Sequence, residues 1–249
     1  MELSVTSIII YLTVICFAAA IHGAIGIGFL MVATPLLTMA ADVKTAILLL
    51  VLPTIFINAA NVISGGSWAK SHGRYWPLAL YSMIGSVLGT RLLLLAPADL
   101  FRPLLAGIII LYLNAERIGL GFSWIISRPK MAMAVFGMVA GVLGGTVNVM
   151  LPPLVIFSLE TKMNKIAMIQ VFNLCLLAGK LGQWAVLIYE GEFTLPVAEA
   201  ALPLAIIALS VTFASMKLRN RIQAETYRKW LRRLLAVMAG VLLLSIFRG

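Results

Sequence analysis

Apolar runs close to 20 residues long recur along the whole chain, and no other feature limits its folding as strongly. A helix of about 20 residues spans roughly 30 Å, the thickness of the hydrocarbon core of a bilayer. Hydrophobic residues make up 62% of the 249 residues and charged residues only 11%, which is too little polar surface for a soluble domain. The sequence therefore predicts an all-α polytopic membrane protein, with apolar segments at 4–40, 45–63, 75–96, 100–115, 131–158, 165–189, 194–216 and 230–247.

Two of these segments contain glycines where a membrane helix is expected to continue. Residues 23–35 read GAIGIGFLMVATP and residues 141–153 read GVLGGTVNVMLPP, with glycine at the first and fourth positions and proline at the last. Glycine weakens a helix and proline removes a backbone donor. Each stretch therefore indicates a helix that is broken inside the membrane.

The same stretches indicate an internal duplication. Gly23 and Gly141 are 118 residues apart, and this offset also relates Pro35 to Pro153, Asp42 to Glu160, and Lys44 to Lys162. Each stretch opens a set of four apolar segments. We therefore predict two transmembrane repeats, 1–120 and 121–249, a plan that secondary transporters often use.

The basic residues predict how the repeats cross the membrane. If every segment were a single span, the loops on the two sides would hold eleven and six of them. If segments 4–40 and 131–158 each enter and return on the same side, the inner loops hold fourteen and the outer loops three, which the positive-inside rule favours. Each repeat is then a broken, re-entrant helical hairpin plus three transmembrane helices, and the odd number of crossings makes them inverted repeats. The second hairpin would have two arms of about 12 residues, or roughly 18 Å each.

The glycine stretches are the first candidate for a binding site. Irregular backbone at membrane depth occurs only where protein or a watery cavity surrounds it. The helix after each turn begins with unpaired N–H groups, which suit an anion. The alternative is close packing of helices through small residues, which membrane proteins use widely. The glycines concerned are Gly23, Gly26, Gly28, Gly141, Gly144 and Gly145, with Asn148 inside the second turn.

Polar side chains inside the spans add to this site. Asn58 and Asn61 are three residues apart and share a helix face. A lysine within a span, such as Lys180, marks a pathway or a charge pair. His22, beside the first turn, could contact a ligand, carry a proton or bond a freed carbonyl. The corresponding span of the second repeat carries Gln170, Asn173, Lys180 and Gln183. The predicted substrate-binding residues are His22, Gly23, Gly26, Gly28, Asn58, Asn61, Gly144, Gly145, Asn148, Asn173 and Lys180.

Several absences narrow the function. All nine acidic residues fall at or near segment ends, so we expect no carboxylate at mid-membrane. Cys16 and Cys175 lie in separate apolar segments without a metal-binding spacing, and we expect no catalytic site, metal or cofactor. The net charge of +10 comes largely from loop residues. Lipid headgroups and the orientation rule explain those residues without nucleic acid.

The paired glycine–proline stretches, the duplicated plan and the basic connector RNRIQAETYRKWLRRLL before the last span resemble the TauE/SafE family of sulfite exporters. The resemblance covers essentially the whole chain. It implies a multi-pass transporter of the bacterial or archaeal cytoplasmic membrane that moves sulfite, sulfonates or related sulfur-containing anions. The family tends to carry a GxGGG-like run in each half, whereas Phe29 or Thr146 stands here at the third glycine of that run. A bulkier organosulfonate is therefore as admissible as sulfite.

Two other functions stay open at this point. The sequence does not fix the direction of transport, so an importer of a related anion is one alternative to an exporter. A membrane protein that handles thiols, or an assembly factor, is the alternative from another class. The expected partners are a small anion and membrane lipid, and a homodimer is compatible with the sequence.

Overall fold

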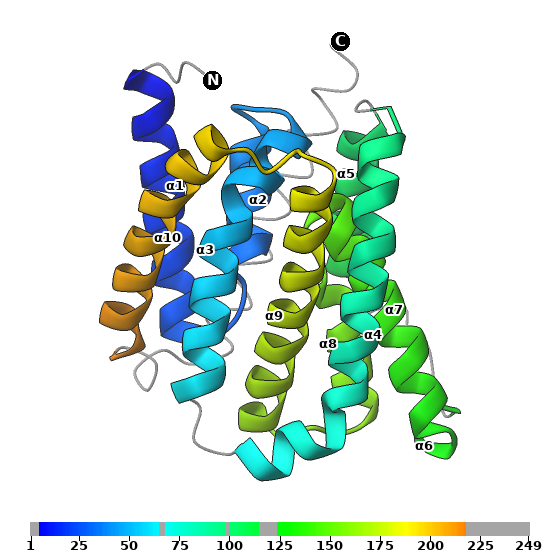
Figure 1. The fold of residues 1–249 in the computed structure, drawn as a ribbon. Helices are drawn as coiled ribbons and strands as arrows, with labels where there is room; N and C mark the ends of the chain where they lie inside the picture. Colours follow the sequence, from blue (N-terminus) through cyan, green and yellow to red (C-terminus); the bar gives the residue numbers. More distant parts are fainter. Residues whose placement is uncertain (1–4, 65–67, 98–99, 115–123, 218–249) are drawn as a thin grey trace.

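The computed structural model describes residues 5–64, 68–97, 100–114 and 124–217, which form a bundle of helices running roughly alongside one another (Figure 1). Every regular element within these ranges is helical. The helices are α1 (Val5–Ile25), α2 (Phe29–Thr38), α3 (Val43–Ser64), α4 (Trp68–Leu95), α5 (Phe101–Asn114), α6 (Trp124–Ser127), α7 (Pro129–Val147), α8 (Leu151–Glu160), α9 (Lys165–Tyr189) and α10 (Leu195–Met216).

Six of these helices, α1, α3, α4, α7, α9 and α10, contain a stretch long and apolar enough to cross a bilayer. Large apolar side chains at i, i+4 and i+8 on α4 (Ile84, Leu88 and Leu92) remain exposed, as a face that contacts lipid requires. The predicted all-α polytopic membrane protein is thus confirmed. The predicted segment 100–115 corresponds to α5, and the predicted segment 230–247 lies outside the described residues.

Both glycine-containing segments are broken, but not into equal arms. Segment 4–40 forms α1 of 21 residues and α2 of 10, and segment 131–158 forms α7 of 19 residues and α8 of 10. The prediction of two arms of similar length in the second segment is therefore wrong. The helix continues through Gly141, Gly144 and Gly145, and the break comes three residues later, at 148–150.

Close helix packing explains why α7 keeps these glycines inside the helix. A Cβ on Gly141 would lie 2.7 Å from the backbone N of Ser86 in α4, and one on Gly145 would lie 2.7 Å from the backbone N of Thr90. Cβ atoms do not come that close to backbone, so only glycine permits this seam between α4 and α7. The packing alternative thus holds for Gly141 and Gly145.

The two broken segments begin at opposite ends of the bundle. In Figure 1, α1 runs inward from the upper end of the bundle and α2 returns toward that end, whereas α7 starts at the lower end and α8 returns there. At the first end, Nζ of Lys44 forms an ion pair at 2.8 Å with Oε1 of Glu192, which joins the start of α3 to the turn after α9. Inverted repeats require this arrangement, although the inverted relation of the complete halves 1–120 and 121–249 stays a prediction.

Helix boundaries in the two halves of the chain are related by a different offset from the predicted 118 residues. The ends of α1 and α7, both ends of α2 and α8, and the starts of α3 and α9 are all 122 residues apart. The capping residues agree: Asp42 accepts from the N–H of Thr45 and Asn164 from the N–H of Ala167, each at 2.9 Å. The offset of 118 is therefore wrong, because it aligned glycines that serve helix packing with glycines that form the break.

Candidate functional site

The first break separates α1 from α2 at residues 26–28. Gly26 and Gly28 have φ angles of 96° and 109°, left-handed values that side-chain-bearing residues rarely adopt. A helix leaves its first N–H groups without partners inside the helix. The N–H of Phe29 in α2 donates instead to Nδ1 of His22, at 3.3 Å. The buried imidazole therefore caps the start of α2.

The second break separates α7 from α8 at residues 148–150. Asn148 takes up a left-handed φ of 62°, a conformation that asparagine tolerates better than most residues. Its N–H donates to the carbonyl of Leu143, as does the N–H of Val149 at 3.3 Å. α8 opens with the sequence Leu-Pro-Pro, so two of its first positions have no N–H. The second helix start therefore lacks the row of donors that we predicted for both breaks.

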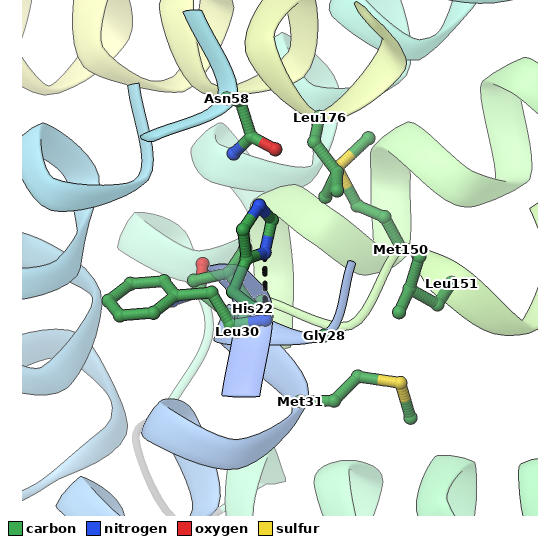
Figure 2. Close-up of a pocket in the computed structure, with 10 residues that line it drawn as sticks. His22, Gly28, Leu30, Met31, Asn58, Met150, Leu151 and Leu176 are labelled. Atoms are coloured by element: carbon green, nitrogen blue, oxygen red, sulfur yellow. Dashed lines mark hydrogen bonds between the residues drawn. The ribbon is translucent and has the colours of Figure 1, made fainter. Parts of the chain in front are cut away.

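A small hollow lies between the two breaks (Figure 2). The ring of His22 and the amide of Asn58 point toward each other across it. Residues from both halves of the chain thus share one cavity. It is lined by His22, Gly28, Phe29, Leu30 and Met31 around the first break, by Asn148, Met150 and Leu151 around the second, by Asn58 of α3 and by Leu176 of α9.

A buried lysine lies directly behind the second break. Lys180 of α9 is 1% exposed, and its Nζ donates to Oδ1 of Asn148 and Oε1 of Gln183. The amide of Gln183 in turn donates to the carbonyl of Gly145 at 2.9 Å. In the part of the chain that the structure describes, no carboxylate lies within ion-pair distance of Lys180. Among the described residues, the side-chain nitrogen of Lys180 is therefore held by neutral oxygens alone.

The first break is held by polar side chains from both halves. Nδ2 of Asn61 in α3 lies 2.8 Å from Nε2 of His22. Nδ2 of Asn173 in α9 donates to the carbonyl of Gly26 at 2.7 Å. α9 thus contacts both breaks, the first through Asn173 and the second through Lys180.

The predicted site residues fall into three groups. His22, Gly28, Asn58 and Asn148 line the hollow. Gly26, Asn61, Asn173 and Lys180 lie at the breaks or bond to residues of the breaks. Gly23, Gly144 and Gly145 are helical: a Cβ on Gly23 would lie 2.8 Å from Cβ of Ser215 in α10, one on Gly144 would meet Met150, and Gly145 faces α4. Contact of any of these residues with a substrate stays a prediction.

Sequence reasoning missed the apolar part of the lining, above all Met150, Leu151 and Leu176. It also gave Gln183 no role in holding the lysine. A signal for the true position of the second break was present, because asparagine followed closely by prolines is typical of a helix end. The apolar lining carried no such signal, since leucine and methionine are common throughout the chain.

Comparison with known proteins adds one match. A family model described as Sulfite exporter TauE/SafE matches residues 11–245. No curated protein and no solved structure matches the chain.

Proposed function

Because the chain belongs to the TauE/SafE sulfite exporter family, we propose that it exports small sulfur-containing anions, such as sulfite or an organosulfonate, by binding them in the hollow between the two breaks. Family membership and the six apolar helices make it a multi-pass membrane transporter of sulfur anions such as sulfite. The export direction, the substrate within this class, the cytoplasmic membrane of a bacterium or archaeon as its location, and a homodimeric assembly are parts of the proposal.

The buried ammonium of Lys180 carries the proposal. A charge inside a membrane protein is costly unless it is paired, and such residues mark the path of a substrate or ion. Asn148, which holds this ammonium, also lines the hollow. An anion bound beside Asn148 would therefore supply the counter-charge that the described protein groups do not provide.

The first break supports the same ligand class. The positive end of the α2 dipole lies at Phe29, and the two following residues, Leu30 and Met31, line the hollow. Backbone N–H groups at a helix start bind oxyanions without a charged side chain. An anion in the hollow would thus meet peptide donors on one side and the lysine-backed amide of Asn148 on the other.

Export of an anion needs no carboxylate relay in the membrane. A membrane potential that is negative inside drives an anion outward with about 2.3 kcal/mol per charge per 100 mV. Among the acidic residues that the structure describes, Glu199 is exposed in the second turn of α10, and the others lie at helix ends or, as Asp42 and Glu192 do, between helices. The potential alone is therefore a sufficient driving force for the proposed export.

The experiment that tests the proposal replaces Lys180 by methionine, which has a similar length and no charge. Lys180 acts on the anion through space from behind Asn148, and two unit charges roughly 8 Å apart attract by about 2 kcal/mol at an effective dielectric constant of about 20, so sulfite should bind roughly 30-fold more weakly. The affinity is measured from the rise in melting temperature with sulfite concentration in purified protein. Transport is measured as sulfite flux in proteoliposomes under an imposed potential, and export requires faster flux toward the positive side.

The matched control is Lys44→Met, which removes a lysine from the ion pair with Glu192 at the end of the bundle. It should leave sulfite affinity unchanged. The melting temperature of Lys180→Met without ligand is measured as well, because the substitution removes a buried charge but leaves Oδ1 of Asn148 and Oε1 of Gln183 without their donor. Wild-type sulfite binding and flux in Lys180→Met would refute the proposed site.

A further inference from the structure

Asn58 and Asn148 both line the hollow, and each keeps a different hydrogen-bonding atom without a partner in the described part of the chain. Nδ2 of Asn58 donates to the carbonyl of Thr54 at 2.7 Å, and a carbonyl pairs only with the nitrogen of an amide, so Oδ1 of Asn58 is left over. Oδ1 of Asn148 accepts from Lys180, whose ammonium only donates, so Nδ2 of Asn148 is left over. The hydrogen-bond partners of the two amides therefore fix which atom of each is the oxygen and which is the nitrogen.

Neither of these two atoms has a hydrogen-bond partner among the described residues. The side chains are fully enclosed, with Asn58 1% and Asn148 0% exposed, and both line the hollow. A buried polar atom without a partner is destabilising, because it has lost its hydrogen bonds to water and gained none from the protein. Two such atoms in one cavity call for a partner that completes both, which a bound ligand or a water molecule can supply.

An oxyanion that only accepts hydrogen bonds satisfies one of the two. Its oxygens suit the Nδ2 donor of Asn148, but Oδ1 of Asn58 is itself an acceptor and repels them. A ligand that carries an O–H or N–H group beside its charged group can donate to Asn58 while it accepts from Asn148. Hydrogen sulfite, hydroxysulfonates and aminosulfonates have this combination, whereas sulfate and simple alkanesulfonates lack it.

We propose that the hollow selects sulfur oxyanions that also carry a hydrogen-bond donor, and that Asn58 is the residue that determines this specificity. The inference rests on the proposed function, because it takes the hollow to be the substrate site. Sites that hydrogen-bond a donor of their substrate discriminate strongly against analogues that lack it, since the protein acceptor is then left unpaired.

Two sulfonates of matched size test this selectivity. Isethionate carries a hydroxyl group where propane-1-sulfonate carries a methyl group. Their affinities for the purified wild-type protein follow from the rise in melting temperature with ligand concentration. Isethionate should bind about tenfold more tightly, the value of one net hydrogen bond near 1.4 kcal/mol. Equal binding, or tighter binding of propane-1-sulfonate, overturns the inference.

Substitution of Asn58 assigns the selectivity to its residue. Asn58→Leu should bind both sulfonates alike, at the affinity that the wild type has for propane-1-sulfonate. Thr54→Val is the matched control: it removes a buried hydroxyl one turn away that does not line the hollow, and it should keep the tenfold preference. A preference that survives in Asn58→Leu contradicts the role of Asn58. Asn58→Ala serves if Asn58→Leu does not accumulate.

The outcomes separate this inference from the proposed function. If sulfite and both sulfonates leave the melting temperature of the wild type unchanged, the hollow is not an anion site and both proposals fail. If all three bind and the hydroxyl group makes no difference, the anion site stands and only the selectivity is wrong. That second result would mean that Oδ1 of Asn58 is satisfied by water in the bound state.

Discussion

The two breaks occupy equivalent places in the chain and present different chemistry. Gly26 and Asn148 are 122 residues apart, and both are left-handed at the end of a long helix. After Gly26 the next helix begins with peptide N–H groups and a histidine cap. After Asn148 the next helix begins with two prolines, and a buried lysine stands behind it. One side of the hollow thus offers backbone donors, and the other offers charge.

The residues that support the breaks differ in the same way. By the offset of 122, Asn58 and Asn61 of α3 correspond to Lys180 and Gln183 of α9. Both pairs keep the three-residue spacing that puts them on one helix face. Under the predicted duplication, the two halves keep the same spacing of helix boundaries while an amide in the first half is replaced by a lysine in the second. A single anion could then meet two unlike surfaces, which a symmetric site would not provide.

The largest effect is expected when a negative charge is placed on the side of the hollow that is backed by Lys180. Asn148→Asp puts a carboxylate beside Lys180, and aspartate tolerates the left-handed conformation. The pair neutralises the lysine and repels an anion, so sulfite affinity should fall about 100-fold or more, since like charges at close range cost several kcal/mol. Binding is measured by ligand-induced thermal shift and transport by flux in proteoliposomes. Asn148→Gly, which keeps the backbone conformation, is the control for the turn itself. Undiminished sulfite flux in Asn148→Asp would show that charge at the second break does not contribute to anion binding.

A medium effect is expected from the backbone of the two breaks. Gly26→Ala forces a side chain into a φ of 96° and should lower the free energy of unfolding by about 1–2 kcal/mol. At the equivalent position, Asn148→Ala should be less stable than Asn148→Gly by a similar amount of about 1–2 kcal/mol, because both variants lose the hydrogen bond to Lys180 and only glycine accepts the φ of 62° without strain. Thermal melting of the purified variants without ligand gives the differences. A loss of stability at only one of the two positions would mean that the two turns are not equivalent.

The smallest effect is expected from giving the second helix start one of its missing donors. Pro153→Ala restores an N–H at the third residue of α8, which makes the second break more like the first. A helix start contributes about 0.3–1 kcal/mol to anion binding, so sulfite should bind two- to fivefold more tightly. Pro203→Ala, which removes a proline inside α10, is the control and should leave the affinity as it is. Weaker sulfite binding in Pro153→Ala would show that the prolines shape the site in another way.

Much of the fold was predictable because the membrane imposes few solutions. Apolar run length indicated the helices, and the glycines of both segments indicated that the helices are broken. The position of the second break was not predicted, because Gly141 and Gly145 had the same appearance as Gly26 and Gly28. A glycine in a helix seam and a glycine in a turn differ only in what lies opposite, and that neighbour, α4, is far away in sequence.

The polar part of the site was predictable for a similar reason. Polar residues in apolar spans are rare enough that His22, Asn58 and Lys180 stood out. The sequence could not reveal that Lys180 reaches Asn148 on another helix, since that contact depends on how α7 and α9 cross. It also could not identify the apolar residues around the hollow.

The bond from Asn173 to the carbonyl of Gly26 ties the second half of the chain to the turn of the first. If transport proceeds by rocking one half against the other, this tie has to be broken and remade in every cycle, or α9 has to travel with the first half. α9 would then move with the first half of the protein, although its sequence lies in the second half. A crosslink that locks α9 to α3 would distinguish these two modes of motion, because it arrests only the first.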